Sequence, residues 1–210
     1  PYTGEGATGL GKPLKSILHM NPEIPIYIGA GNEATVRLTT EICDGLLPLG
    51  LTPSSAHEYV PWIEEGFARA NKKGEAKSFD NFDVTASVHV DINDDVKAAL
   101  ARLKPEVALY VGGMGHRSKN FHKDMMTRRG FGDAANRIQE LYLAGRKQEA
   151  TDAVPDEWVD EKSLVGSPDR IRERCKRWAA LEVVDSGYIR TTQDAAVDLM
   201  AEAAGLAPAR

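Results

Sequence analysis

A glycine-rich turn is the first segment of the chain with the residue types and spacing of a ligand-binding site. Residues 29–34 read GAGNEA and match the pattern G-x-G-x-x-A, directly after the apolar run Ile24–Ile28 and before a helical pattern. Glycines let backbone amides approach an anion, and a helix N-terminus adds unpaired N–H groups and a positive dipole end. The sequence therefore predicts phosphate binding by this turn, with a plain tight turn as the alternative.

The same turn fits a nicotinamide dinucleotide site only in part. Such a site also needs an acidic residue at the end of the following strand, where it holds a ribose. That strand ends at Leu51-Thr52-Pro53, and Asp44 comes before it. An NAD-binding Rossmann module is therefore the weaker alternative. Residues 6–12, GATGLGK, begin like a nucleoside triphosphate loop, but Pro13 replaces the required hydroxyl residue, so we expect no triphosphate site.

Two polar residues near the end of a predicted strand could move protons. Residues 82–92 alternate strictly, which places His89 and Asp91 on the polar face. Histidine titrates near neutral pH and serves as an acid or a base. A histidine within a satisfied polar layer is nevertheless the commoner arrangement, so the sequence identifies no catalytic residue.

A second glycine-rich run, residues 112–122, combines cations with His116 and His122. It has no H-E-x-x-H motif and no carboxylate at ligand spacing, so we expect no metal site there. A mobile loop or a subunit contact is its first interpretation, and substrate binding is the second. Cys43 and Cys175 fall on apolar helix stripes without a CxxC partner, which favours small buried side chains over redox chemistry.

Strands that alternate with helices must position these residues. Residues 1–22 are predicted as a loop, with at most a short helix near Leu14–Leu18, and residues 112–181 as a helical insertion without a strand. The pattern predicts a capping box at Ser55 and Glu58, a helix cap at Asp94, and a kink or helix end at Pro105. The apolar runs and alternating segments predict four βα units of a parallel α/β fold, with strands at 24–28, 46–51, 82–92 and 183–189.

Length and composition restrict the class of protein. The chain has 210 residues, a formal charge of −5, 42% hydrophobic residues and 27% charged residues, as in one globular domain that spans residues 1–210. This balance predicts a cytoplasmic protein that binds neither nucleic acid nor membrane. An eight-unit barrel needs about 250 residues. Four units and an insertion already fill this chain, and it begins at Pro1, so we expect the C-terminal part of a longer barrel protein.

Several fragments spread along the chain carry a family resemblance. In combination they resemble the luciferase-like monooxygenase superfamily, and within it the actinobacterial coenzyme F420-dependent oxidoreductases. The fragments are residues 2–15, 26–31, 41–45, 111–115, 120–122, 144–147 and 166–171.

The resemblance implies a (β/α)8 TIM barrel, of which this chain would supply about the last four βα units plus the insertion. It also implies coenzyme F420, or FMN as the alternative, at the C-terminal ends of the strands, exchanging a hydride with a small organic substrate. Its phosphate-binding loop falls on Gly29, Ala30, Gly31 and Asn32. A homodimer or higher homo-oligomer is the expected assembly, because insertions before the eighth strand often form subunit contacts in such folds.

A non-catalytic protein is the second hypothesis. A truncated half-barrel would leave two sheet edges open, and proteins normally cover such edges. It would then act as a cofactor-binding or oligomerising module.

Overall fold

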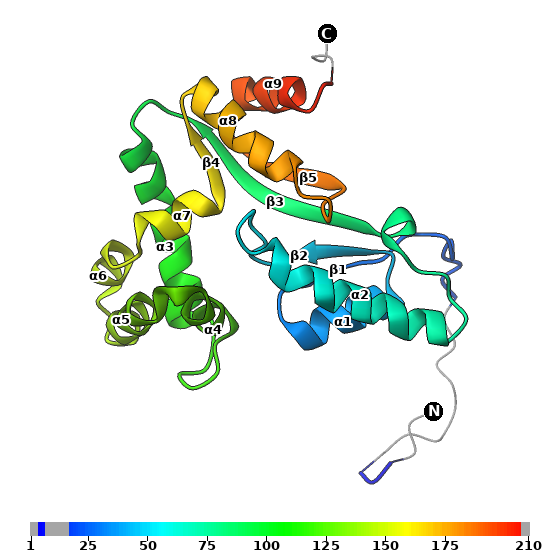
Figure 1. Ribbon diagram of the computed structural model, residues 1–210. Helices are drawn as coiled ribbons and strands as arrows, with labels where there is room; N and C mark the ends of the chain where they lie inside the picture. Colours follow the sequence, from blue (N-terminus) through cyan, green and yellow to red (C-terminus); the bar gives the residue numbers. More distant parts are fainter. Residues whose placement is uncertain (1–3, 7–16, 207–210) are drawn as a thin grey trace.

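The protein is an α/β structure built on one parallel sheet, seen in a computed structural model that describes residues 4–6 and 17–206 (Figure 1). Most of the triphosphate-loop stretch and of the predicted Leu14–Leu18 helix lies outside the described residues. The five strands are β1 (Tyr27–Ala30), β2 (Gly45–Pro48), β3 (Asp83–Ile92), β4 (Ser163–Gly166) and β5 (Ser186–Arg190). All the strand pairs are parallel, as the alternation of strands and helices predicted.

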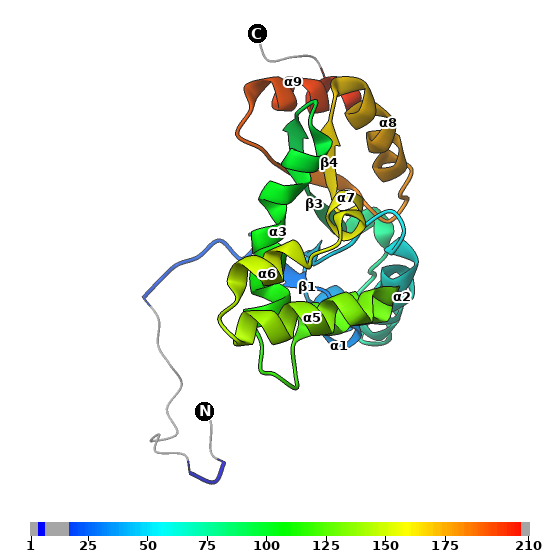
Figure 2. The same ribbon diagram turned by 90° about the vertical axis from the view of Figure 1, so that its left-hand side faces the viewer.

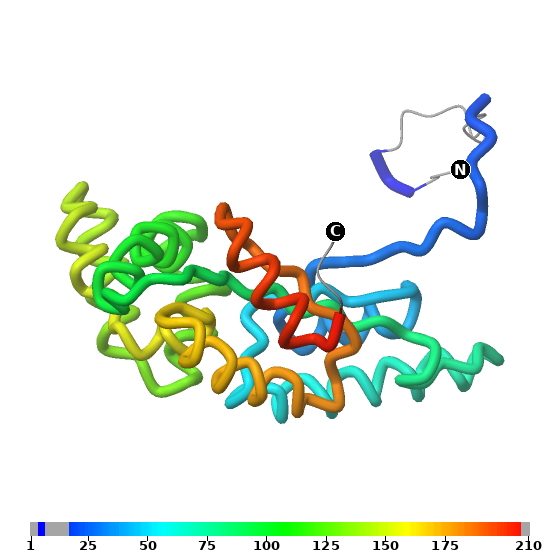
Figure 3. The backbone as a smooth tube through the Cα atoms, turned by 90° about the horizontal axis from the view of Figure 1, so that it is seen from above, coloured from blue at the N-terminus to red at the C-terminus, as the bar shows by residue number. Residues whose placement is uncertain are grey.

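β3 is the organising strand of the sheet. Its side chains alternate as predicted: Val84, Ala86, Val88 and Val90 are buried, whereas Ser87 on the opposite face is exposed. Helices cover the buried face because its valines and alanine need apolar cover. These helices are α2 (Ala56–Lys72), α8 (Pro168–Ala179) and α9 (Asp194–Ala203). The view from above shows two of them, in cyan and orange, along one side of the sheet (Figure 3).

β3 pairs with other strands along both of its edges, but along one edge only at the two ends of the strand. On one edge β5 pairs along residues 85–89, and the amide of Asp185 donates to the carbonyl of Val84 at 3.1 Å. The opposite edge pairs with β2 at residues 83–84 and with β4 at residues 89–92. The stretch of β3 between these two pairings therefore has no strand beside it on that edge.

β4 corrects the prediction that residues 112–181 contain no strand. The four residues of β4 are all buried and pair with the end of β3. A run this short carries no period, so only its partner strand stabilises it as a strand. The helices around this strand form a helical lobe with one shared core of buried apolar residues. Figure 2 shows how these helices are arranged. They are α3 (Val96–Gly113), α4 (Phe121–Met126), α5 (Gly132–Leu143), α6 (Lys147–Asp152) and α7 (Asp156–Glu161).

The ends of α2 and α3 differ from the prediction, whereas the start of α1 (Glu33–Ile42) is capped by the glycine turn itself. Asn32 caps α1 by accepting from the amide of Thr35 at 3.0 Å. The predicted capping box of α2 is wrong, because the Ser55 hydroxyl bonds within its own turn and Glu58 binds two arginines. At α3 the capping residue is Asp95 in place of Asp94, and the helix continues through Pro105.

The face of the sheet opposite the helices is open to solvent in this chain. Large apolar side chains on β1, β2 and β5 stay exposed there, with Tyr27 at 39%, Leu47 at 40% and Tyr188 at 60% of full exposure. In a closed fold, further apolar side chains normally cover such a surface. Within residues 4–6 and 17–206, no helix is both long and apolar enough to cross a bilayer.

Candidate functional site

The cavity at the unpaired edge of β3

A cavity of about 430 Å³ lies beside the unpaired edge of β3, between the end of β2 and the start of β4. Its volume falls in the range of small-molecule sites. One wall is the loop after β2, residues 48–51, and the opposite wall is α3 with the start of β4. The apolar lining comes from Leu49, Leu51, Leu103, Val107, Val111, Met125, Trp158 and Val159.

Polar groups gather at one part of this cavity. His89 of β3 pairs in register with Ser163 of β4 and Arg190 of β5, so the sheet itself brings these three residues together. Lys162 precedes Ser163 and also lines the cavity, with its ammonium 5.1 Å from the ring centre of Trp158. The cavity therefore combines an apolar wall with a cationic end.

Burial alters the proton affinity of these groups. Desolvation lowers the pKa of His89, and Arg190 lowers it further. The pKa of Lys162 falls to about 8, mainly through desolvation and then through the charge of Arg129. At neutral pH the lysine is thus still charged, while the histidine is neutral.

His122 is the part of the 112–122 run that reaches the cavity. Its ring packs against that of Tyr110 at a tilt of 55°, with centroids 4.6 Å apart, and burial lowers its pKa. Asn120 holds the start of α4 against α3, because its side chain donates to the carbonyls of Tyr110 and Val111. His116 instead lies on an exposed turn and contacts Ser118.

Asp91 has a structural role and does not share the cavity with His89. It is buried, forms an ion pair with Arg102, and accepts from the Gln193 amide at 3.1 Å. Gln193 also accepts from the amide of Ile92, which ties the start of α9 to the end of β3. Of the two polar residues predicted on this strand face, only His89 therefore reaches the cavity.

The predicted glycine turn begins two residues later than expected, because Gly29 and Ala30 are the last residues of β1 and pair with β2, and it lies beside the cavity wall. A Cβ on Gly31 would come within 2.6 Å of both the Leu49 carbonyl oxygen and the Phe121 ring, so tight packing explains this glycine. A Cβ on Gly29 would meet only the Leu49 side chain, at 3.8 Å. Ala30 is buried and Asn32 caps α1. Packing or capping therefore accounts for three of the four predicted residues. Gly29, which has free space around it, is the exception.

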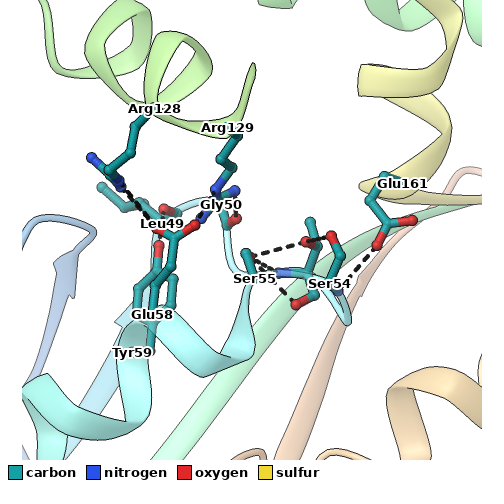
Figure 4. Close-up of polar contacts among 10 residues, drawn as sticks. Leu49, Gly50, Ser54, Ser55, Glu58, Tyr59, Arg128, Arg129 and Glu161 are labelled. Atoms are coloured by element: carbon teal, nitrogen blue, oxygen red, sulfur yellow. Dashed lines mark hydrogen bonds and ion pairs between the residues drawn. The ribbon is translucent and has the colours of Figure 1, made fainter. Parts of the chain in front are cut away.

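Two arginines fix the loop that forms the cavity wall (Figure 4). Arg129 donates to the Gly50 carbonyl at 2.6 Å and to Glu58 at 3.0 Å, while Arg128 binds the same carboxylate at 3.0 Å. Burial alone would raise the pKa of Glu58, but the two guanidinium groups hold it below its ordinary value. Tyr59 adds a hydrogen bond to the Leu49 carbonyl at 2.8 Å.

A second cavity of about 570 Å³ lies on the other side of Trp158 and Lys162, which line both cavities. Its lining is mostly polar, and its charged groups are largely paired with one another. Glu58 binds Arg128 and Arg129, and Glu161 binds Arg177 and the amide of Ser54.

Sequence patterns located part of this site. His89, His122 and the glycine turn stood out, but Lys162 and Arg190 belong to no motif and reach the cavity only through the pairing of β3 with β4 and β5. In the described part of the chain, no three His, Cys, Asp or Glu side chains gather as a metal site. Cys43 is buried and Cys175 partly buried, and both are free.

Comparison with known proteins

Residues 2–184 match the family model of the luciferase-like monooxygenases. The chain belongs to this family, as the sequence fragments indicated. A Mycobacterium tuberculosis relative, named "Putative coenzyme F420-dependent oxidoreductase Rv3520c", is 42% identical over 201 residues, covering 93% of this chain and 57% of the relative. A 5,10-methylenetetrahydromethanopterin reductase of Methanopyrus kandleri is 26% identical, covering 86% of this chain and 49% of that protein.

Solved structures agree with this assignment. The coenzyme F420 dependent tetrahydromethanopterin reductase of Methanopyrus kandleri has a TM-score of 0.64 at 25% identity, over 84% of this chain and 49% of that one. An F420-dependent secondary alcohol dehydrogenase gives 0.58 at 14% identity, over 89% of this chain and 48% of the other, and this similarity concerns the fold. The chain thus spans about half the length of the curated relatives and solved structures that it matches.

Proposed function

We propose that this protein is an oxidoreductase that transfers a hydride between coenzyme F420 and a small organic substrate. Family membership supports redox chemistry, and relatives named for F420 favour that cofactor over a flavin. In this proposal the chain supplies the last four βα units of a TIM barrel, with β1, β2, β3 and β5 as its fifth to eighth strands, and acts in the cytoplasm as a homo-oligomer.

The single observation that carries the proposal is the position of the cavity. It opens where β2 ends and β4 begins, beside the later half of β3. Active sites of α/β barrels lie at the C-terminal ends of the strands. The open face of the sheet beside it gives space for a planar ring system, and exposed Tyr27 and Leu47 offer it apolar contact.

Gly29, Ala30, Gly31 and Asn32 would hold the phosphate of the cofactor. The geometry fits at Gly29, where packing leaves room, and at the first turn of α1, where helix geometry leaves backbone N–H groups unpaired. Bound F420 would supply the hydride chemistry itself. The chain would orient the substrate in the cavity, and neutral His89 would be available to accept or hold a proton there.

A titration with F420 and with FMN tests the proposal, with absorbance and fluorescence as readouts. We expect saturable binding of F420 and much weaker binding of FMN. Tighter binding of FMN would change the cofactor, and binding of neither would overturn the proposal. Gly29→Ala tests the loop, because the added methyl leaves packing intact and crowds only the proposed phosphate. Gly29→Ala should weaken F420 binding without a change in melting temperature. The control Gly132→Ala, in a helix, should leave F420 binding unchanged.

The open sheet face supports a second candidate, a non-catalytic half-barrel that acts by self-association. Exposed Leu47, Leu49 and Tyr188 would be buried in such an assembly. Sedimentation and the cofactor titration together distinguish the two, because the first candidate is also expected as an oligomer. A protein that binds F420 contradicts the second candidate, and an oligomer that binds neither cofactor supports it.

A further inference from the structure

Lys162 is a cation that the described part of the chain leaves without an ionic partner. Neighbouring carboxylates pair with other cations: Asp160 binds Arg170 and Arg174, Glu161 binds Arg177, and Glu106 binds Arg190. The ammonium of Lys162 lies over the aromatic face of Trp158. A partly buried ammonium with only an aromatic face beside it keeps most of the cost of its desolvation.

The cavity as a whole carries an excess positive charge. Arg190 and Glu106 neutralise each other at 3.3 Å, and burial keeps His89 and His122 neutral near pH 7. Lys162 remains as the uncompensated charge on the lining. One negative charge on a ligand would balance it, whereas a neutral ligand would leave it buried and unpaired.

The rest of the lining restricts the body of such a ligand. Leu103, Val107 and Val111 present one face of α3, Met125 adds a further apolar side chain, and Trp158 lies next to Lys162. An apolar wall of this kind gains free energy by excluding water from hydrocarbon. The cavity therefore combines a single cation with a surface that suits an alkyl or aryl group.

We propose that this cavity binds an organic monoanion, a carboxylate on an apolar body, with the carboxylate on Lys162 and the hydrocarbon against α3. This inference rests on the proposed function in one respect: it names the class of substrate that the oxidoreductase would take. Binding of the anion itself requires no cofactor, so the two can be tested separately.

Calorimetry of the protein without cofactor, with octanoate as the probe, tests the proposal. Octanamide serves as the neutral probe of the same length, and inorganic phosphate as the anion without an apolar body. We expect octanoate to bind at least tenfold more tightly than either. Equal binding of octanamide would overturn the role of Lys162, and equal binding of phosphate would overturn that of the apolar wall.

Lys162→Met keeps the length and apolar stem of the side chain and removes its charge. We expect at least a tenfold loss of octanoate affinity with little change for octanamide. Lys147→Met is the matched control, because Lys147 also lies over an aromatic ring, Tyr142, at 5.5 Å but outside the cavity. An unchanged octanoate affinity in Lys162→Met would refute the proposal.

The pH dependence of octanoate binding to the unaltered protein gives a second measurement that does not depend on a variant. The charged groups around Lys162 are Arg129, Glu106 and Arg190, with His122 nearby. Octanoate affinity should begin to fall above pH 8, where Lys162 loses its proton, and an affinity that stays constant to pH 10 would contradict the assignment. If F420 binds and octanoate does not, this inference fails while the proposed function stands, and the reverse outcome rejects only the cofactor.

Discussion

Arg129 donates from its guanidinium to the carbonyl oxygen of Gly50 at 2.6 Å, which connects the helical lobe directly to the loop after β2. The two residues lie 79 positions apart in the sequence. Gly50 has a φ of +83°, a conformation that favours glycine, so the loop already depends on an unusual backbone at this point. The arginine therefore holds one wall of the ligand cavity in place.

Replacement of Arg129 should loosen this wall. We expect Arg129→Met to destabilise the protein by about 2 kcal/mol, because it leaves the Gly50 carbonyl and Glu58 without a main partner. The loss stays below that of a fully satisfied buried pair, since Nη2 of Arg129 has no hydrogen-bond partner among the described residues. Urea unfolding measures the change, and hydrogen exchange should rise selectively at residues 49–52.

Arg128→Met is the control for that experiment. Arg128 binds the same carboxylate, but 44% of its side chain is exposed, against 11% for Arg129. Exposed ion pairs contribute about 0–1 kcal/mol, so this variant should stay close to the original stability. Equal losses in the two variants would show that Glu58, and not the Gly50 carbonyl, is the important contact.

Gly66→Ala should destabilise the protein although it improves helix propensity. A Cβ at Gly66 would lie 1.8 Å from the Thr40 hydroxyl oxygen and 2.6 Å from the Arg37 carbonyl oxygen, so α1 and α2 would have to separate. We expect a loss of about 3 kcal/mol, as for an overpacked core. Gly132→Ala, also helical, meets only a methyl of Thr127 at 3.4 Å and should leave thermal stability equal or higher.

Stability should fall as the pH drops below 6.5, in part through His122. Its pKa in the folded state is lowered by burial and by Lys162, so the unfolded chain binds the proton first. The loss begins near the ordinary value of 6.5 and ends once the folded state is protonated as well. His122→Phe should reduce this slope in pH-dependent urea unfolding. An unchanged slope in His122→Phe would contradict this assignment.

Lys162→Met should make the protein more stable at pH 7. The pKa of Lys162 is lowered from 10.5 to about 8, so its charged form is disfavoured in the folded state. Since the side chain is partly accessible, we expect a gain of about 1–2 kcal/mol. The original protein should gain stability between pH 8 and 10.5, and the variant should lack that rise. Thermal unfolding at several pH values measures both effects.

Local patterns predicted the elements that are stabilised locally. The alternation of residues 82–92 specified β3 and its buried face. Failures came where residues far apart in the sequence compete. Glu58 binds two arginines some seventy positions away and does not form the predicted capping box. β4 is a strand only because β3 lies beside it.

The candidate site follows the same rule. A histidine on a polar strand face is visible in the sequence, so His89 could be singled out. Its neighbours Ser163 and Arg190 are set by strand register, which no spacing along the chain encodes. Asp91, two residues from His89, binds Arg102 and Gln193, which come from other parts of the chain.

The length of β3 determines how wide the cavity can be. β2 is attached at Val84 and β4 at His89, so the two walls stand on one continuous piece of extended backbone. Five residues of strand span roughly 16 Å, and extended backbone stretches very little. The walls cannot spread apart without breaking a ladder of hydrogen bonds. Ligands should therefore enter and leave through rotation of side chains such as Met125 and His122, at rates set by rotamer changes and not by domain movement.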